Sequence, residues 1–293
     1  MADNTQIVAQ PSKTKLKQLI WPDPLVVPSR GIHTHTIILL HGRGSNGERL
    51  GLELLKARGS DNKTLAEHFP GLKFVFPTAK KRRAVAFNRT PINQWFDNHS
   101  LEEPSERQEL QYDGLHETSG FVHGLIKEEA KHVGISSVII GGLSQGCGAS
   151  LHVLLNFQPD EGALLGYIGM CGWLPFADIL DAEDDEDDIF RDAPDTPLLQ
   201  RQHSAAATAR DISSLPSLSL DLDTPPAFAQ TPVFLGHGTH DDRVLIKLGE
   251  QARDVLVRLG CDVQWKEYDE GHWYKVPDEI DDLVAWLKMC CNF

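Results

Sequence analysis

The sequence is poor in the features that mark membrane, secreted and nucleic-acid-binding proteins. It has no apolar run of transmembrane length, and residues 1–18 lack the apolar core of a signal peptide. Basic residues are scarce: 28 lysines and arginines stand against 42 aspartates and glutamates, so the net charge is −14. This balance argues against nucleic-acid binding and against electrostatic attachment to an anionic lipid surface. We therefore expect a cytoplasmic protein.

Cysteine is also rare, and its arrangement excludes the usual cysteine frameworks. The five cysteines are Cys147, Cys171, Cys261, Cys290 and Cys291. Their number is odd and their spacing is not that of a metal-binding motif, which indicates reduced thiols in a reducing compartment. We expect no metal centre and no cofactor.

What the sequence does contain is an alternation of strand-like and helix-like segments. Its 293 residues suffice for one large α/β domain with an insertion. The pattern predicts a mostly parallel central sheet covered by helices on both faces. Strands are expected at residues 32–40, 72–76, 135–140, 164–170, 232–235 and 263–268. Helices are expected at residues 49–58, 65–69, 108–133, 149–157, 243–259 and 277–290.

Two stretches depart from this alternation. Residues 1–30 are polar and contain proline, and we expect an irregular lead-in before a single domain at residues 31–293. Residues 181–226 hold twelve acidic and three basic residues and few aromatics. Such a composition buries too little apolar surface to offset the entropy of ordering the chain. We therefore predict that 181–226 is a disordered acidic insertion.

The most informative segment is residues 138–146, where an apolar β-branched run leads into Gly-x-Ser-x-Gly at Ser144. A helix-like segment follows. A serine at a tight turn between a strand and a helix has its hydroxyl exposed, and small neighbours allow the turn. The amides at the start of the helix point to any group above the serine oxygen. The segment therefore indicates the nucleophile elbow of an α/β-hydrolase, with Ser144 as nucleophile.

An activated serine needs a base and a carboxylate that orients the base. In α/β-hydrolases the acid precedes the histidine along the chain. Asp241 follows the strand at 232–235, and His272 follows the strand at 263–268, so we expect Asp241 as the acid and His272 as the base. Asp242, the next residue, is an alternative acid. The oxyanion should be held by two backbone amides, those of Gln145 and Arg43.

Six motifs now occur in one order along the chain. They are His41-Gly-Arg-Gly, Trp95-Phe-Asp, Gly-Gly-Leu-Ser144-Gln-Gly, Cys-Gly-Trp-Leu174-Pro, His237-Gly-x-x-Asp241-x-x-Val and Gly271-His272. In this order and approximate spacing the chain resembles the phospholipase/carboxylesterase family, which includes the acyl-protein thioesterases. The resemblance runs from about residue 31 to 287, apart from 181–226. It implies a compact α/β-hydrolase without a large lid domain.

The resemblance also implies an activity. Members of the family use a Ser-His-Asp triad to hydrolyse thioesters and carboxylic esters of medium or long acyl chains, and their substrates include acylated proteins, lysophospholipids and small acyl esters. Carried over by position, an acyl groove would be lined by Trp95, Phe96, Trp173 and Leu174, although ordinary core packing explains these four residues equally well. The resemblance leaves transient membrane contact open, and it fits either a monomer or a weak homodimer.

The chain departs from the family at two positions near the serine. Arg43 stands where family members usually have an apolar residue, and we hypothesise that it favours substrates with a carboxylate or phosphate near the scissile carbonyl. Cys147 replaces a small residue and is expected to pack as a small hydrophobe. Two alternatives remain: a general carboxylesterase acting on small esters, and a catalytically inactive binding protein with a hydrolase fold.

Overall fold

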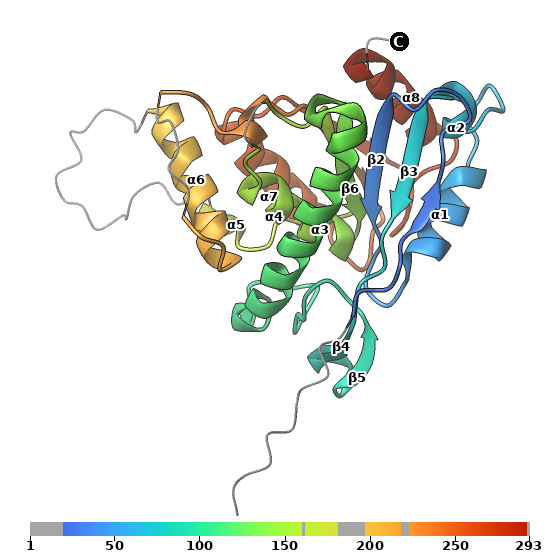
Figure 1. Cartoon of the computed structure of the whole chain (residues 1–293). Coiled ribbons are helices and arrows are strands. Elements are labelled where there is room, and N and C mark those ends of the chain that lie inside the picture. The colour runs from blue at the N-terminus through green and yellow to red at the C-terminus, as the bar shows by residue number, and fades with distance from the viewer. Residues whose placement is uncertain (1–19, 160–161, 181–196, 218–222, 292–293) are drawn as a thin grey trace, which may run out of the picture.

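The fold is built on a seven-stranded sheet with the order β1-β3-β2-β6-β7-β8-β9 (Figure 1). The computed structural model describes residues 20–159, 162–180, 197–217 and 223–291. All neighbouring strands in this sheet are parallel except β1 and β3. The strands are β1 (Leu25–Val27), β2 (His35–Leu40), β3 (Leu72–Phe76), β6 (Val138–Leu143), β7 (Gly166–Met170), β8 (Val233–Gly238) and β9 (Val263–Tyr268). The predicted parallel α/β sheet is confirmed.

Helices cover both faces of the sheet, so the central strands are apolar along their whole length. In β2, Ile38 and Leu40 belong to one hydrophobic core, and Ile37 and Leu39 belong to the other. The first core is shared with α3 (Tyr112–Val133), α4 (Gln145–Asn156), α6 (Leu198–Ile212) and α7 (Ile246–Arg258). The second is shared with α1 (Gly47–Lys56), α2 (Leu65–His68) and α8 (Asp278–Cys291). A short helix, α5 (Ala177–Leu180), precedes α6 along the chain.

The segment expected to be a long polar loop contains a small antiparallel hairpin. Its strands are β4 (Lys81–Ala84) and β5 (Thr90–Asn93), and it lies at one end of the molecule, away from the label of α8 (Figure 1). Arg82 Nη2 lies 2.7 Å from Glu117 Oε2 on α3, and Lys80 Nζ lies 3.2 Å from the same oxygen. These ion pairs attach the base of the hairpin to the main domain.

The lead-in is more regular than predicted in its described part, which begins at residue 20. β1 extends the sheet by pairing with β3, with Val26 opposite Val75. Next to it, the Trp21 ring stacks on Phe121 of α3 with 4.0 Å between ring centroids. An edge strand of three residues carries too few apolar positions to show a period in the sequence. Residues 1–19 lie outside the described residues.

The prediction of disorder is wrong for residues 197–217, which contain helix α6. The buried side of α6 carries small side chains, among them Ala205, Ala206 and Ala209, and this side packs near α4. Arg210 Nη1 donates a hydrogen bond of 2.6 Å to the carbonyl of Asn156 at the end of α4. Alanine is the best helix former and allows close packing, although it contributes little hydrophobicity to a composition count. The acidic run at 181–196 and residues 218–222 lie outside the described residues.

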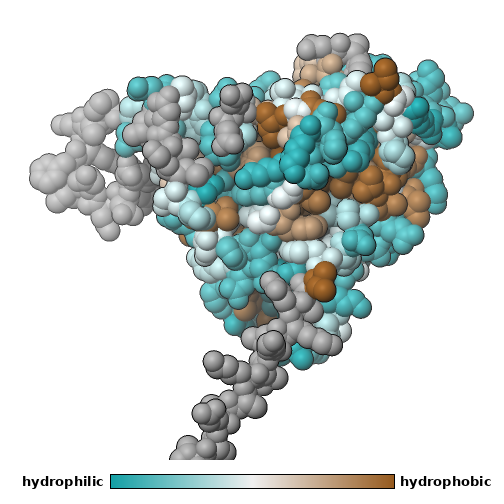
Figure 2. All heavy atoms as spheres, in the orientation of Figure 1, coloured by the Kyte–Doolittle hydropathy of each residue, from teal (hydrophilic) through white to brown (hydrophobic). Residues whose placement is uncertain are grey.

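The outer surface of the helical layer is polar. On α3 the buried residues recur every three to four positions, for example Leu115, Ser119, Val122 and Ile126. The intervening side chains form the largely hydrophilic surface over α3 in Figure 2. None of the described helices is both long and apolar enough to cross a membrane. Within the described residues no separate lid domain covers the sheet.

We predict that α6 is an integral part of the first core. Substituting the fully buried Ala209 with aspartate places a charge in that core and should lower the free energy of unfolding by about 3 kcal/mol or more. Ala207 lies on the same helix and is exposed, so Ala207→Asp should cost about 1 kcal/mol or less. Urea unfolding followed by circular dichroism measures both. Equal losses in the two variants would contradict the packing of α6.

Candidate active site

Ser144 occupies a strained turn between β6 and α4. Its backbone has φ 56° and ψ −122°, a conformation that L-residues rarely adopt. The turn is held by a hydrogen bond of 2.9 Å from Ser144 N to the carbonyl of Met170. A Cβ atom on Gly146 would collide with the backbone oxygen of Leu40, and one on Gly142 would collide with the backbone of Gly146. The small residues around Ser144 are therefore required by the close approach of α4 to β2.

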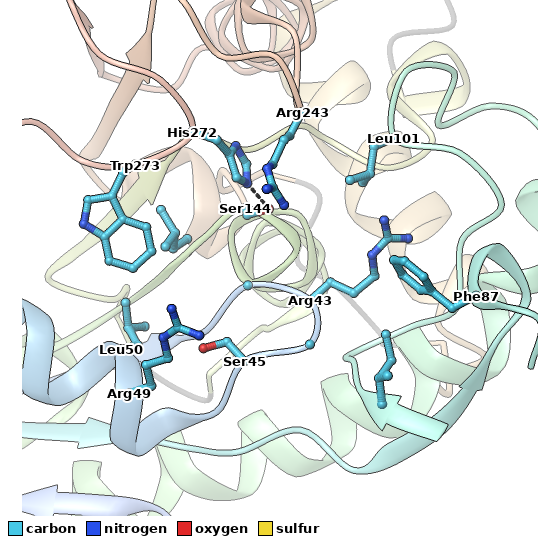
Figure 3. A pocket seen from close by; sticks show the side chains of 14 residues that line it. Arg43, Ser45, Arg49, Leu50, Phe87, Leu101, Ser144, Arg243, His272 and Trp273 are labelled. Atoms are coloured by element: carbon cyan, nitrogen blue, oxygen red, sulfur yellow. Dashed lines mark hydrogen bonds between the residues drawn. The ribbon is translucent and has the colours of Figure 1, made fainter. Parts of the chain in front are cut away.

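Three loops at the carboxyl ends of the strands bring Ser144, His272 and Asp241 together (Figure 3 shows the first two). His272 Nε2 lies 2.8 Å from Ser144 Oγ, and His272 Nδ1 lies 2.7 Å from Asp241 Oδ2. Asp241 is buried, whereas His272 is half-buried at the edge of a cavity. The three predicted residues thus form one continuous hydrogen-bonded chain.

The carboxylate of Asp241 is held on both oxygens. Oδ1 accepts hydrogen bonds of 2.9 Å from the backbone N–H groups of Arg243 and Val244, and His237 Nε2 lies 3.4 Å from Oδ2. Burial by itself raises the pKa of Asp241, but the bonds from His237, His272 and Val244 lower it well below its usual range. Asp241 is therefore ionised beside His272. Asp242, the alternative acid, is exposed, and the carboxylate that His272 Nδ1 contacts is that of Asp241.

The two amides expected to hold an oxyanion lie on either side of Ser144. Gln145 is the first residue of α4, where helix N–H groups have no partner within the helix. Arg43 follows Gly42, and a Cβ atom added at Gly42 would lie 3.3 Å from Ser144 Cβ. The loop after β2 and the start of α4 therefore meet beside the serine.

The Gln145 side chain ties the elbow to the segment after β5. Its Oε1 accepts a hydrogen bond of 3.0 Å from Trp95 N. Its Nε2 donates bonds of 2.8 Å to the carbonyl of Phe96 and 3.1 Å to Asn98 Oδ1. Because all these atoms are buried, a glutamine directly after the serine is a structural requirement as well as a source of a backbone amide.

His41 and Trp95 brace the end of β2. Trp95 Nε1 donates a hydrogen bond of 2.7 Å to the carbonyl of His41. The His41 ring donates from Nδ1 to the carbonyl of Gly42 at 2.7 Å and accepts from Ala79 N at Nε2 at 3.0 Å. Burial lowers the pKa of His41 to about 4, so the ring is neutral at neutral pH. His41 is a structural residue.

The four residues predicted to line an acyl groove do not reach the cavity at Ser144. Trp95 and Phe96 are fully buried, and Trp173 and Leu174 are at most 3% exposed. The Trp173 ring packs edge-on against Phe96 with 5.9 Å between ring centroids. Trp173 and Leu174 border a separate, smaller cavity of about 170 Å³. The structure therefore favours the alternative of core packing for these four residues, and Trp95 and Phe96 also support Gln145.

The cavity next to Ser144 has a volume of about 500 Å³ and is lined from other parts of the chain (Figure 3). Its lining includes six apolar side chains: Leu50, Phe87, Ile92, Leu101, Leu143 and Trp273. It also includes three arginines: Arg43, Arg49 and Arg243. Sequence reasoning named only Arg43 among these nine. A usable signal existed for Arg243 and Trp273, because they follow Asp241 and His272 within two residues.

Cys147 lies below the elbow and is packed as expected. Gly169 and Gly172 leave the space that its sulfur occupies, and Tyr167 donates a hydrogen bond of 2.9 Å to its carbonyl. Burial raises the pKa of the Cys147 thiol to about 12, so this thiol stays protonated and unreactive at neutral pH. Among the described residues, no group of three or more His, Cys, Asp or Glu side chains is arranged to hold a metal ion.

The sheet topology and the geometry at Ser144 define an α/β-hydrolase. Residues 22–187, more than half of the chain, match the profile of the Phospholipase/Carboxylesterase family, and the chain belongs to that family. It is therefore an enzyme that hydrolyses carboxylic esters or thioesters. Residues 124–293, which carry Ser144, Asp241 and His272, also match the profile of the prolyl oligopeptidase family.

Similar proteins extend over nearly the whole chain. Acyl-protein thioesterase 1 of Yarrowia lipolytica is 28% identical over 272 residues, covering 91% of this chain and 97% of the relative. Acyl-protein thioesterase 1 of Gibberella zeae is 26% identical, covering 90% and 94%. The crystal structure of Zea mays acyl-protein thioesterase 2 is 26% identical with a TM-score of 0.63, covering 91% and 98%. Arabidopsis thaliana SOBER1, at 21% identity, a TM-score of 0.62 and coverage of 88% and 99%, shares the fold.

One buried carboxyl group lies behind the site and is not part of it. Glu279 of α8 is 1% exposed, and its Oε1 occupies the space left by the missing side chain of Gly236 in β8. Its Oε2 accepts a hydrogen bond of 2.9 Å from Lys275 N, whereas Oε1 has no partner among the described residues. Burial raises the pKa of Glu279 to about 8, the Lys275 N–H opposes the rise, and the charge of Asp282 adds to it.

This raised pKa predicts a pH-dependent stability. The unfolded chain releases the proton near the ordinary value of 4.5, while the folded protein keeps it up to about 8. The free energy of unfolding should therefore fall as the pH rises through this window, by up to about 1.4 kcal/mol per pH unit. Glu279→Gln should remove this loss, whereas Glu102→Gln, at an exposed residue, should follow the wild type. Urea midpoints at pH 5, 7 and 8.5 test it, and a Glu279→Gln curve parallel to the wild type would contradict it.

Proposed function

We propose that Ser144, His272 and Asp241 are the catalytic triad of this hydrolase and that the substrates are thioesters or carboxylic esters of medium or long acyl chains. One observation carries the assignment of residues. The Ser144–His272–Asp241 chain, with distances of 2.8 and 2.7 Å, opens directly into the cavity of about 500 Å³. That volume is within the range of sites for small ligands.

In the first step, His272 Nε2 takes the proton from Ser144 Oγ as this oxygen attacks the acyl carbonyl carbon. The tetrahedral intermediate collapses, and His272 gives the proton to the departing alcohol or thiol. In the second step, water attacks the acyl-enzyme with His272 again as base, which releases the carboxylic acid and restores Ser144. Asp241, ionised and buried, holds the His272 ring and stabilises its positive charge in both steps.

The backbone N–H groups of Gln145 and Arg43 would hold the oxyanion. Both flank Ser144, and the buried bonds of the Gln145 side chain fix its backbone before substrate binds. Hydrogen-bond donors that are already in position stabilise the transition state without the free-energy cost of rearrangement. Loss of one such donor typically costs about 3 kcal/mol of transition-state stabilisation.

Two observations support acyl chains as the bound group. The apolar part of the lining, which includes Phe87, Leu101 and Trp273, offers a surface for methylene groups. Relatives that match nearly the whole chain include acyl-protein thioesterases, which suggests an acylated protein as one substrate. The mixed lining also admits smaller acyl esters.

We predict that Ser144→Ala abolishes labelling by a fluorophosphonate probe and lowers kcat for ester hydrolysis at least about 10⁴-fold, because the attacking oxygen is gone. Ser136→Ala is the matched control: Ser136 is exposed and precedes β6 at the end opposite to Ser144. It should retain labelling and activity. Gel fluorescence and steady-state kinetics measure both. Probe attachment that persists in Ser144→Ala would refute Ser144 as the nucleophile.

We predict that Asp241→Asn lowers kcat by about 10⁴-fold with little change in fold, since an amide cannot hold the His272 tautomer that the reaction needs. Asp242→Asn should stay within about threefold of the wild type, because Asp242 is exposed and outside the hydrogen-bonded chain. Comparing kcat of the two variants tests the assignment. A larger loss in Asp242→Asn than in Asp241→Asn would transfer the acid role to Asp242.

A further inference from the structure

The cavity at Ser144 has the opposite charge to the rest of the protein. The chain as a whole carries a net charge of −14, yet among the described residues three arginines and no aspartate or glutamate line this cavity. They come from separate segments: Arg43 from the loop after β2, Arg49 from α1 and Arg243 from the loop after β8. In Figure 3 these three side chains surround the opening near Ser144 and His272.

Arg43 is fixed in place before any ligand binds. Its Nη1 donates a hydrogen bond of 3.1 Å to Asn98 Oδ1, and its guanidinium lies 5.0 Å from the centroid of the Phe87 ring. Burial lowers the pKa of Arg43, and the negative charge of Asp97 raises it in part. The positive charge of Arg243 lowers the pKa of Arg43 further, because the two guanidinium groups repel each other. Asp97 itself accepts hydrogen bonds from Val85 N at 3.1 and 3.3 Å.

The Arg243 and Arg49 side chains lack such partners among the described residues. In the part of the chain that the structure describes, no ion pair joins either guanidinium to a carboxylate, although exposed acids, Asp242 and Glu48, are adjacent in sequence. Their backbones are nonetheless fixed. Arg243 N donates to Asp241 Oδ1 at 2.9 Å, and Arg49 N donates to Asn46 Oδ1 at 2.8 Å. The backbone of Arg243 is therefore bonded directly to Asp241, the proposed acid of the triad.

The part of the cavity lined by the arginines is a poor site for hydrocarbon. Covering guanidinium groups with methylene groups removes their water without supplying an acceptor. A carboxylate or phosphate supplies two oxygens to the planar fork of an arginine and relieves the repulsion between Arg43 and Arg243. The apolar residues Phe87, Leu101 and Trp273 of the same lining still offer a surface for the acyl chain.

We propose that this cavity selects esters and thioesters that carry an anionic oxyacid group, a carboxylate or a phosphate, near the scissile carbonyl, and that Arg243 together with Arg43 binds this group. The proposal rests on Ser144 acting as the nucleophile as proposed above. Arg49, an exposed residue of the same lining, attracts the anion on entry. The anionic group belongs either to the acyl part of the substrate or to its leaving group.

Three oxygen esters of similar size separate these two sources: 1-hexanoylglycerol is neutral, 1-adipoylglycerol has a carboxylate on the acyl chain, and 1-hexanoylglycerol 3-phosphate has a phosphate on the leaving group. We expect kcat/KM for at least one anionic ester to exceed that for the neutral ester tenfold or more at low ionic strength. This preference should weaken as sodium chloride is added. The ester that is preferred identifies the source of the charge.

The variant that tests the assignment is Arg243→Gln. It should lower the anionic-to-neutral ratio of kcat/KM at least tenfold, and Arg49→Gln should lower it less. Arg83→Gln, at an exposed arginine of β4 outside the cavity, should leave the ratio unchanged. A wild-type enzyme that hydrolyses the neutral ester as fast as both anionic esters overturns the proposal, as does an unchanged ratio in Arg243→Gln.

Protection of Ser144 from fluorophosphonate labelling, which needs no substrate turnover, distinguishes failure of the anion-binding proposal from failure of the proposed function. Adipate or glycerol 3-phosphate should slow fluorophosphonate labelling of Ser144 in the wild type, and hexanamide or glycerol should not. Arg243→Gln should lose this protection. Labelling that depends on Ser144 but is not slowed by either anion overturns anion selection and leaves the proposed function standing. Absence of both labelling and hydrolysis overturns the proposed function itself.

Discussion

The structure depends on the close approach of the start of α4 to the end of β2. At this contact neither Gly142 nor Gly146 has space for a Cβ atom, and Ser144 adopts a backbone conformation that costs about 1–3 kcal/mol. The two hydrophobic cores on either side of the sheet, and the buried bonds of Gln145, stabilise the turn in this state. The strain is what presents the serine hydroxyl above the sheet.

Much of the fold was predictable because its central strands are apolar on both faces. Continuous β-branched runs such as that of β6 need two covering layers, and this requirement alone predicts a parallel sheet between helices. The strands expected at residues 72–76 and 263–268 match β3 and β9 at both ends. The elements missed are those whose stability comes from specific partners: β1 is three residues long, α6 packs through alanines, and the hairpin of β4 and β5 is attached by ion pairs.

The site was predictable in its chemistry but not in its walls. Ser144, Asp241 and His272 each follow a recognisable strand, so their convergence follows from topology. The walls are formed by single side chains from separate segments of the chain. No local sequence pattern predicts that Phe87 and Leu101 line the same cavity. The Trp95-Phe-Asp motif misled for a physical reason: Trp95 is buried and makes hydrogen bonds to Gln145 and His41 instead of lining the cavity.

Asn98 links the turn at Ser144 to the wall of the cavity. Its side-chain oxygen accepts hydrogen bonds of 3.1 Å from both Gln145 Nε2 and Arg43 Nη1. One buried atom therefore joins the residue after the serine to an arginine of the cavity wall. Substitutions at position 43 and position 145 are consequently coupled, since each changes the partner that Asn98 offers to the other. A substitution at position 43 therefore also alters the hydrogen bonding that holds Gln145 beside Ser144.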